Sequence, residues 1–519
     1  MKLRENKIDK YVAWLLIISA LVRGFLATFL EFGNDEVYYW TYAMYPDWSH
    51  FDHPGMVGWL MQIFSLNLLF HSEFALRLSS VIFMTIDTYI IYKLGCLVYN
   101  KLAGFYAALL YTASLYCFII TGIFIMPDTP LMMFTLLAIY CFILSFRGER
   151  SEAEESAKHY LLAGLFTGLA LLSKYSAAFI WVGVGLYVLI FDRKQLKNKY
   201  LYLSALISII CMLPVLIWNL QNDFISFTFH GDRVSFFGKL QPLDFLAEII
   251  GEFGYNNPIN YVLIIIALVA FFKGSQYLEK TSGRFLLCFA LPFIGLFWFF
   301  SLMRETLPHW SAPAFSILLL FPASYFAEKS SNDEIIRLPK PIIATVSLLV
   351  FVLFFGVLEI KTGVIPMRFG ERANSVRYYG EGDFTNTIYG WRSIKDDFQK
   401  IRQEKVLEGE MSESDGMIGL QWFPMANFDY YVANPLGINM YGIRNIDKIH
   451  KYYWINEYRG GLQKGNDYWF LNESSDYYAP ERYLDDRFEE IIPCDTITVE
   501  RCGRPSKYVF VYMCKGLKW

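Results

Sequence analysis

The sequence predicts a polytopic α-helical membrane protein that ends in a soluble α/β domain. The 519-residue chain is 55% hydrophobic and only 18% charged, a balance that is too apolar for a soluble protein of this length. Apolar runs of the length needed to cross a bilayer, about 20 residues each, recur as far as residue 358, and a polar, tyrosine-rich region follows. The net charge of −3 argues against a nucleic-acid-binding protein, which would carry a basic excess.

The apolar runs predict about eleven membrane spans. The first run lacks a small-residue cleavage site and is followed by further apolar runs, so we expect it to remain as an anchor. The predicted spans lie near residues 11–30, 76–98, 102–125, 129–146, 160–174, 175–191, 200–218, 257–272, 284–302, 308–326 and 341–358.

One further uncharged run, Pro54–Ser72, is also long enough to span. The positive-inside rule decides its placement, because basic residues concentrate in cytoplasmic loops. If this run does not cross, the N-terminus and most of the basic loops fall on the cytoplasmic side; if it crosses, most of those loops face outward. We therefore expect an interfacial or re-entrant helix on the outer face. The basic loops are residues 99–101, 147–159, 192–199, 273–283 and 327–340.

This topology predicts a multi-pass membrane protein with a cytoplasmic N-terminus and three regions. They are a membrane body (residues 1–358), a first outer loop within it (31–75) and an extracytoplasmic α/β domain (359–519). Within that domain, the spacing of Ser393–Lys405 predicts a helix, and the aromatic and β-branched runs Tyr468–Leu471 and Lys507–Met513 predict strands.

Cysteines are present in both the membrane body and the C-terminal domain. Those in the spans are expected to be inert apolar residues. Cys494 and Cys502 flank a Thr/Val-rich run that could form a hairpin. A disulfide between them is compatible with an oxidising compartment, but spacing alone does not assign it.

The first outer loop begins with adjacent carboxylates, Asp35 and Glu36, followed closely by Tyr38. Ionisable groups beside a span are costly and are therefore functional candidates. Adjacent residues on a helix do not share a face, so only one carboxylate is expected to point into a site. The alternative is that Asn34 and Asp35 form a solvated cap of the next helix.

The same loop contains Asp52 and His53 immediately before Pro54. A carboxylate and a histidine beside a helix N-terminus suit phosphate binding or metal ligation. The simpler interpretation is a capping aspartate with a surface histidine. Asp35, Asp52 and His53 could together ligate a divalent metal ion, although no fixed spacing requires one.

Other polar groups recur at span ends on the predicted outer side. Lys174 is the most informative, because a lysine between two apolar helices is costly unless it snorkels to the interface or meets an anion. Snorkelling alone would explain it equally well. The coincidence of all these groups on one side favours a site there. The groups are Asp128, Lys174, Tyr175, Arg233, Arg304 and His309.

Taken together, the short motifs resemble the family 39-type glycosyltransferases, which include relatives of the dolichyl-phosphate-mannose protein mannosyltransferases and of the lipid A aminoarabinose transferase. The resemblance covers roughly residues 10–325. The motifs that carry it are Asp35-Glu36, Phe51-Asp52-His53-Pro54, Pro127-Asp128-Thr129-Pro130-Leu131, Leu172-Ser173-Lys174-Tyr175 and Leu307-Pro308-His309-Trp310.

The resemblance implies a GT-C fold of about 11 transmembrane helices with outer-face interfacial helices, and a donor sugar carried on a polyprenyl phosphate. It places the general base on Asp35. The family often has a second proline where this chain has Gly55, and its lipid A-modifying branch often has lysine where this chain has His53. These departures leave the donor sugar and the acceptor open.

The expected reaction is inverting glycosyl transfer to a lipid, glycan or protein acceptor on the outer face. Asp35 would deprotonate the acceptor, with Glu36 in support. Because a lipid phosphate leaves as a stable anion, one carboxylate suffices where glycosidases need two. Positive charge and N–H donors would hold the phosphate. The alternative is a transporter or flippase of lipid-linked sugars, in which ionisable groups would be expected nearer mid-membrane.

Overall fold

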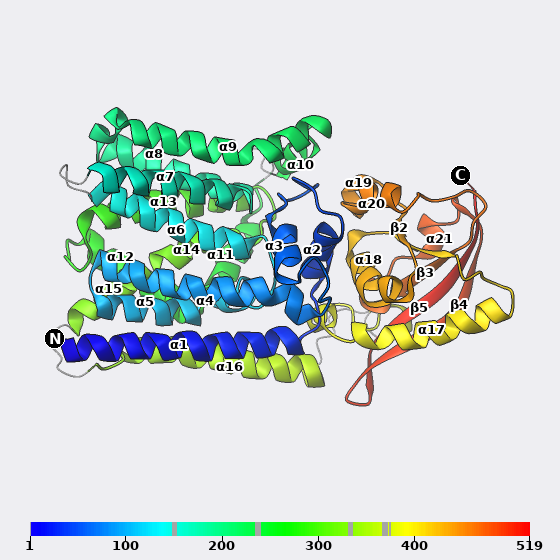
Figure 1. The fold of residues 1–519 in the computed structure, drawn as a ribbon. Helices are drawn as coiled ribbons and strands as arrows, with labels where there is room; N and C mark the ends of the chain where they lie inside the picture. Colours follow the sequence, from blue (N-terminus) through cyan, green and yellow to red (C-terminus); the bar gives the residue numbers. More distant parts are fainter. Residues whose placement is uncertain are drawn as a thin grey trace. The chain divides into compact units, whose positions relative to one another are not determined.

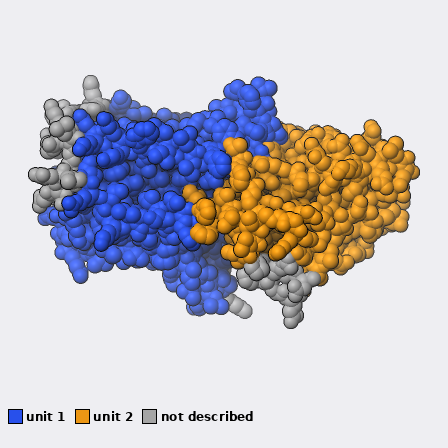
Figure 2. Space-filling view, turned by 90° about the horizontal axis from the view of Figure 1, so that it is seen from below, with its two compact units in different colours: residues 1–27, 47–352 blue, residues 28–46, 353–519 orange. Residues whose placement is uncertain are grey.

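The computed structural model describes residues 2–147, 153–233, 240–330, 336–365, 372 and 375–518. The chain forms two compact units, coloured blue and orange in Figure 2. The first comprises Met1–Ala27 and Asp47–Val352, and the second comprises Thr28–Pro46 and Leu353–Trp519. The segment that carries Asp35 therefore groups with the C-terminal region, whereas the sequence had suggested one outer loop over residues 31–75.

The first unit is a bundle of α-helices (Figure 1). Its long helices are α1 (Lys2–Phe29), α4 (Glu73–Val98), α6 (Asp128–Arg147), α7 (Ala153–Leu171), α9 (Lys199–Gln221), α13 (Lys280–Ser301) and α16 (Lys340–Thr362). The C-terminal ends of α1 and α16 are grouped with the second unit. Its shorter helices are α3 (Met56–Phe64), α5 (Lys101–Ala113), α8 (Phe179–Ile190), α10 (Ile225–Arg233), α11 (Pro242–Tyr255), α12 (Pro258–Phe272), α14 (Ala312–Leu318) and α15 (Leu320–Lys329). Side chains cap several of these helices; Ser72, for example, accepts the Ala75 N–H at the start of α4.

Six helices in the described part of the chain are long and apolar enough to cross a membrane: α1, α4, α6, α9, α13 and α16. Helices α11 and α12 add a seventh if they are one span, although they meet at a bend of 100°. All eleven predicted segments contain helix, but the number eleven is not confirmed. The run 102–125 breaks at Ser114, and the run 308–326 divides into α14 and α15.

The ambiguous run Pro54–Ser72 contains only the nine-residue helix α3. A helix of that length is too short to cross the hydrocarbon core, which requires about 20 residues. Leu66, Asn67 and Leu68 follow it with positive φ angles of 53°, 56° and 62°, which end the helical path. The run therefore does not cross as one continuous helix, and its interfacial placement remains a prediction.

Small residues allow helices of the first unit to approach closely. A Cβ atom added to Gly95 of α4 would lie 2.5 Å from the Cα atom of Gly104 in α5, so neither position has room for a side chain. The Ser208 hydroxyl of α9 donates a 2.7 Å hydrogen bond to the Gly164 carbonyl of α7. Close backbone contact and interhelical hydrogen bonds are the interactions that join helices where water does not drive association.

The second unit contains a five-stranded mixed sheet in the order β2-β1-β3-β5-β4. Strands β1, β2 and β3 run parallel, and β5 pairs antiparallel with both β3 and β4. The strands are β1 (Gly416–Gly419), β2 (Met440–Gly442), β3 (Tyr468–Glu473), β4 (Phe488–Arg501) and β5 (Arg504–Leu517). The helices are α2 (Asn34–Met44), α17 (Trp391–Leu407), α18 (Trp422–Phe428), α19 (Ile446–Ile449), α20 (Tyr452–Tyr458) and α21 (Pro480–Tyr483).

The predicted elements of this α/β unit are confirmed. Ser393–Lys405 lies inside α17, and the two aromatic runs form β3 and part of β5. Helix α17 buries Ile394, Phe398 and Ile401, spaced four and three residues apart on one face. Phe398 meets Trp469 of β3 edge to face, with ring centroids 5.4 Å apart. Strand β3 is buried at every position, which matches its place at the centre of the sheet.

The disulfide suggested for Cys494 and Cys502 is contradicted, since both cysteines are free. The Thr/Val-rich run between them is not a hairpin but a continuous part of β4, and Cys502 lies in the turn that leads to β5. A separation of eight residues along an extended strand places two Cα atoms about 26 Å apart. The Cα atoms of disulfide-bonded cysteines lie no more than about 7 Å apart.

Candidate functional site

A polar loop, residues 47–55, precedes α3 in the first unit. Asp47 anchors it, because its carboxylate accepts the indole N–H of Trp218 at 2.8 Å and its carbonyl accepts that of Trp59 at 3.1 Å. Within the loop, the His50 N–H donates to the His53 carbonyl at 3.0 Å. These contacts fix the backbone that presents Asp52 and His53.

Asp128 and Lys174 form a largely buried ion pair in the first unit. The Lys174 ammonium lies 2.8 Å from Oδ2 and 3.1 Å from Oδ1 of Asp128, and the Tyr116 hydroxyl donates to Oδ1 at 2.8 Å. The side chain of Asp128 is 2% exposed and that of Lys174 is 13% exposed. Lys174 therefore does not simply snorkel to water, because it meets the anion that its burial requires.

Helix α10 packs against the polar loop. The Nε2 atom of His230 lies 2.6 Å from the Asp52 carbonyl oxygen, so His230 carries its proton on that nitrogen. Tyr175 hydrogen-bonds Ser226 at 2.9 Å, and its ring lies 5.2 Å from that of His230. The ring centroids of His53 and His230 are 5.9 Å apart. The sequence motifs at Asp52–His53 and Lys174–Tyr175 thus meet around α10.

His53 and His309 share one electrostatic environment with the ion pair. Loss of solvation, opposed by Asp52 and reinforced by Lys174, lowers the pKa of His53 to about 3. Loss of solvation and then Lys174 lower the pKa of His309 to about 4, against the opposing effect of Asp128. Both imidazoles are therefore neutral at pH 7 and offer N–H donors rather than positive charge.

Two glutamates of α11 hold the loop that carries Arg304 and His309. The Thr306 hydroxyl donates to Glu248 at 2.8 Å. Glu252 accepts the Ser311 hydroxyl at 2.5 Å and the indole N–H of Trp298 at 2.8 Å. The sequence motifs did not point to these residues. Their signal was two carboxylates four positions apart in an apolar helix, where an unpaired charge would be costly.

In the second unit, Glu36 caps α2: its carboxylate accepts the Gly33 N–H at 3.1 Å, as in a capping box. The Asn34 side chain also accepts the Asp35 N–H at 2.9 Å. Asn34 therefore takes part in capping, as the alternative suggested, together with Glu36. Asp35 lies in the first turn of α2 and is partly exposed. Tyr38 is buried in an aromatic cluster, with its ring 5.2 Å from Trp422, so packing accounts for its position.

Three polar contacts hold the segment that carries Asp35 within the second unit. Glu31 accepts the Trp391 N–H at 2.6 Å, and the Tyr431 hydroxyl accepts the Phe32 N–H at 2.7 Å. At the other end of α2, the Arg459 guanidinium donates to the Tyr45 hydroxyl at 2.9 Å. The residues that follow the last span therefore fix the position of the helix that carries the predicted base.

Among the predicted site arginines, the structure describes the side chain of Arg304 but not that of Arg233. Arg233 is the last residue of α10, and its side chain lies outside the described residues. Arg304 is half-buried in the loop held by α11. Among the described residues, no three histidine, cysteine, aspartate or glutamate side chains converge as metal ligands would. The expected set of Asp35, Asp52 and His53 gains no support as a metal site.

Comparisons of the sequence with known proteins agree with the motif resemblance. Residues 52–218 match the family of dolichyl-phosphate-mannose-protein mannosyltransferases. The chain is 22% identical over 291 residues to a lipid A galacturonosyltransferase of Rhizobium johnstonii, covering 55% of this chain and 58% of that protein. It is 24% identical over 293 residues to an undecaprenyl phosphate-alpha-4-amino-4-deoxy-L-arabinose arabinosyl transferase of Yersinia enterocolitica, covering 53% and 50%. The chain thus spans about half the length of these relatives.

The fold matches a solved structure over almost its whole length. ArnT from Cupriavidus metallidurans in the apo state aligns with a TM-score of 0.63 and 13% identity, covering 97% of this chain and 98% of that one. The same protein bound to undecaprenyl phosphate aligns with a TM-score of 0.62 and 12% identity, over the same shares of the two chains. The chain is a membrane protein of the GT-C fold, related to these glycosyltransferases as the motifs implied.

Proposed function

We propose that this relative of the protein mannosyltransferases and of ArnT transfers a sugar from a polyprenyl phosphate to an acceptor. The ion pair of Asp128 and Lys174, surrounded by Tyr116, His53 and His309, is the observation that carries the proposal. A buried ammonium with neutral imidazoles nearby suits a phosphate, which needs one strong charge and several N–H donors.

Lys174 is the proposed phosphate-binding cation. An ammonium has three N–H donors, and two of them account for its contacts with the two oxygens of Asp128. The third is available to a ligand oxygen. Asp128 and Tyr116 hold the ammonium in place and compensate its charge while the site is empty, so the donor does not have to order a mobile side chain.

Asp35 keeps the role of general base that the motif resemblance implies. In the proposed step, the acceptor hydroxyl or amine transfers its proton to Asp35 while its oxygen or nitrogen attacks the anomeric carbon. The bond between that carbon and the phosphate oxygen breaks, and its electron pair leaves with the lipid phosphate. Attack from the side opposite the phosphate inverts the anomeric centre. Glu36 supports the step indirectly, by capping the helix on which Asp35 lies.

The comparisons support the class of donor. By their names, the two relatives transfer galacturonic acid or aminoarabinose, the latter from undecaprenyl phosphate, and the fold matches a protein that binds undecaprenyl phosphate. We extend this to a polyprenyl-phosphate sugar as donor and to a lipid, glycan or protein acceptor. The loop-charge pattern supports action at the outer face of a bacterial inner membrane, with the C-terminal unit extracytoplasmic.

The test is incubation of the purified chain with a panel of polyprenyl-phosphate sugars and membrane extract. Mass spectrometry then identifies the acceptor whose mass has increased by that of the sugar. Transfer by the wild-type chain, lost in Asp35→Asn and Lys174→Met, is the expected result. If the wild-type chain transfers none of the sugars, the proposal is overturned. Normal turnover by Asp35→Asn would overturn the assignment of the base alone.

Asp447→Asn is the matched control. Like Asp35, Asp447 is an aspartate in the first turn of a helix of the second unit, in this case α19. Its substitution should leave transfer unchanged. Vesicles with the donor on one side distinguish the alternative of a flippase, which would move the lipid-linked sugar without forming a new glycosidic bond.

A further inference from the structure

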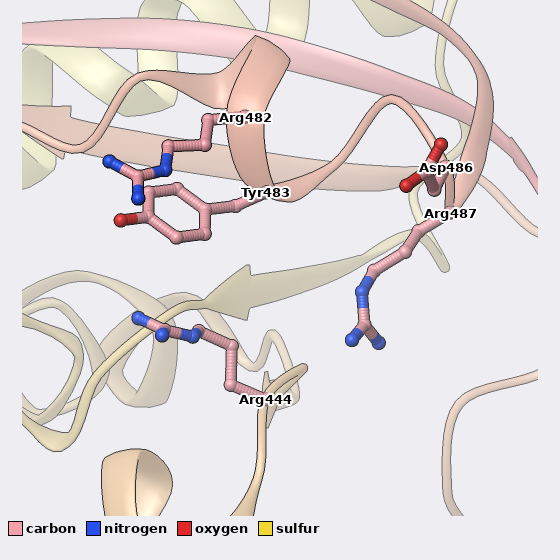
Figure 3. Close-up of a pocket in the computed structure, with 5 residues that line it drawn as sticks. All are labelled: Arg444, Arg482, Tyr483, Asp486 and Arg487. Atoms are coloured by element: carbon pink, nitrogen blue, oxygen red, sulfur yellow. The ribbon is translucent and has the colours of Figure 1, made fainter.

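The second unit contains an open surface pocket of about 400 Å³ with a basic lining, called the arginine cavity below (Figure 3). Arg444 follows strand β2, Arg482 and Tyr483 belong to α21, and Asp486 and Arg487 immediately precede β4. Segments distant in sequence thus contribute three guanidinium groups and one carboxylate to one small space. The proposed transfer reaction assigns no role to any of them.

Tyr483 is flanked by two of the arginines. The guanidinium carbon of Arg444 lies 4.7 Å from the centre of the Tyr483 ring, and that of Arg482 lies 5.5 Å from it. In the view of Figure 3, the Arg482 guanidinium lies beside the ring and the Arg444 guanidinium lies below it. Cation–π contact orients each of these side chains while leaving its N–H groups along the edge of the guanidinium available to an anion.

The backbone that carries Arg487 is fixed. Its N–H donates to the Leu484 carbonyl at 2.9 Å, and its carbonyl accepts the Lys518 N–H at 2.8 Å. Figure 3 shows the Asp486 carboxylate pointing away from the Arg487 guanidinium. With three guanidinium groups and one carboxylate, the lining has an excess of positive charge.

The positive charges in the cavity repel one another. Partial burial and then the nearby Arg444 lower the pKa of Arg487, against the opposing effect of Asp486. Like charges at short range repel one another, and an anion bound among them relieves that repulsion. Arginine is also the side chain whose planar fork matches a phosphate or carboxylate with two parallel hydrogen bonds.

We propose that this arginine cavity is a binding site for a phosphate-bearing group, such as a phosphomonoester or a pyrophosphate. Three guanidinium groups exceed what a single carboxylate would balance, whereas a doubly charged phosphate matches the net charge of the lining. The volume lies within the range of small-molecule sites, about 300–1,000 Å³, so the cavity accommodates a head group and not only a single ion. The ligand could be a lipid head group or a soluble phosphate compound. The site does not depend on the proposed transfer reaction.

The test is calorimetric titration of the full-length chain in neutral lipid nanodiscs with inorganic pyrophosphate. A second arm measures co-sedimentation of the detergent-purified chain with phosphatidylcholine vesicles that contain or lack phosphatidic acid, a phosphomonoester lipid. The double variant Arg444→Gln/Arg487→Gln should weaken binding at least about tenfold, since two charge-assisted contacts are lost. Asp486→Asn should tighten it about threefold, because it removes a nearby like charge of the ligand.

Arg377→Gln is the matched control, because Arg377 stacks on Tyr477 at 5.2 Å in the same unit but does not line the cavity. The affinity of the Arg377→Gln variant for pyrophosphate or for the vesicles should remain within about twofold of wild type. Binding in the pyrophosphate arm alone assigns a soluble ligand, and binding in the vesicle arm assigns a lipid head group. Absence of binding in both arms, or equal binding by the double variant, the control and the wild type, overturns the proposal.

Discussion

The Lys174 ammonium contacts both carboxylate oxygens of Asp128, at 2.8 and 3.1 Å, across 46 positions of sequence. Both side chains are largely buried. In water such a pair would contribute little, but within a helical bundle each charge depends on the other because neither has solvent to replace its partner. The relationship explains how a lysine can lie between two apolar helices, and it makes the pair sensitive to the loss of one member.

We first predict that Asp128→Asn is more harmful than the double change Asp128→Asn/Lys174→Met. The single substitution leaves a buried ammonium without its anion, which costs about 3–5 kcal/mol, whereas the double substitution removes both charges. Thermal unfolding in one detergent measures the difference. Both variants should lose transfer by at least about a hundredfold, since the proposed phosphate-binding charge is displaced or absent. Equal unfolding temperatures for the two variants would show that the charges are not coupled.

The second prediction concerns the hydrogen bond that the Tyr116 hydroxyl donates to the Asp128 carboxylate. Tyr116→Phe removes one hydrogen bond to a buried carboxylate, so it should lower the free energy of unfolding by about 1–3 kcal/mol and reduce transfer. Tyr106→Phe is the control, because Tyr106 also donates a hydrogen bond, at 2.7 Å to the Arg337 carbonyl. A similar stability loss in both variants, with transfer lost only in Tyr116→Phe, is expected. Unchanged transfer in Tyr116→Phe would contradict a role in orienting the pair.

The sequence identified the two charged residues of this arrangement but not their pairing. Lys174 and Asp128 were both singled out because charges beside apolar helices are costly. Their pairing could not be deduced, since spacing along a chain says nothing about which helices pack together. Tyr116 gave no signal at all, because a tyrosine in an apolar run is ordinarily read as packing.

The regular structure was predictable to a similar degree. Apolar length located helices in all eleven predicted segments, but it could not detect the break at Ser114 or the bend between α11 and α12, which depend on tertiary packing. Glu36 illustrates the same limit: its capping contact with Gly33 is local, yet residue preference suggested only Asn34 and Asp35 as capping residues. The grouping of residues 28–46 with the C-terminal region rests on contacts such as that of Glu31 with Trp391, which no local pattern encodes.

The third prediction is a pH dependence of stability that arises from His53 and His309. Their folded pKa values, about 3 and about 4, lie below the ordinary value of about 6.5. As pH falls below 6.5, the unfolded chain binds protons before the folded chain does, so folding loses free energy between pH 6.5 and about 3, the lower of the two folded pKa values. Above pH 6.5 both states are neutral, and these residues add no slope.

Unfolding temperatures at pH 7.5, 6.0 and 5.0 measure this effect. The double variant His53→Gln/His309→Gln should lose less stability on acidification than the wild-type chain. His159→Gln, a substitution near the start of α7, serves as the control and should keep the wild-type slope. An identical slope in the double variant would show that other groups cause the acid sensitivity.

The fourth prediction concerns the core of the second unit, where Lys507 and Glu473 form an almost fully buried ion pair at 2.9 Å. The Lys507 ammonium also lies 3.4 Å from the centre of the Trp391 ring and donates to the Asn386 carbonyl. Lys507→Met should destabilise this unit by about 3–5 kcal/mol, because it leaves the Glu473 carboxylate buried without its cation. Adding Glu473→Leu should recover most of that loss.

Lys515→Met is the appropriate control for Lys507→Met. Lys515 also pairs with an acidic residue of the second unit, Asp467, at 2.8 Å, but the two side chains are 23% and 29% exposed. Its removal should cost no more than about 1 kcal/mol, as for a solvent-accessible pair. Limited proteolysis of the full chain, with the cut sites after residue 375 read by mass spectrometry, measures opening of this unit directly. Equal protection of the two single variants would contradict the view that burial, and not the presence of an ion pair, determines what Lys507 contributes.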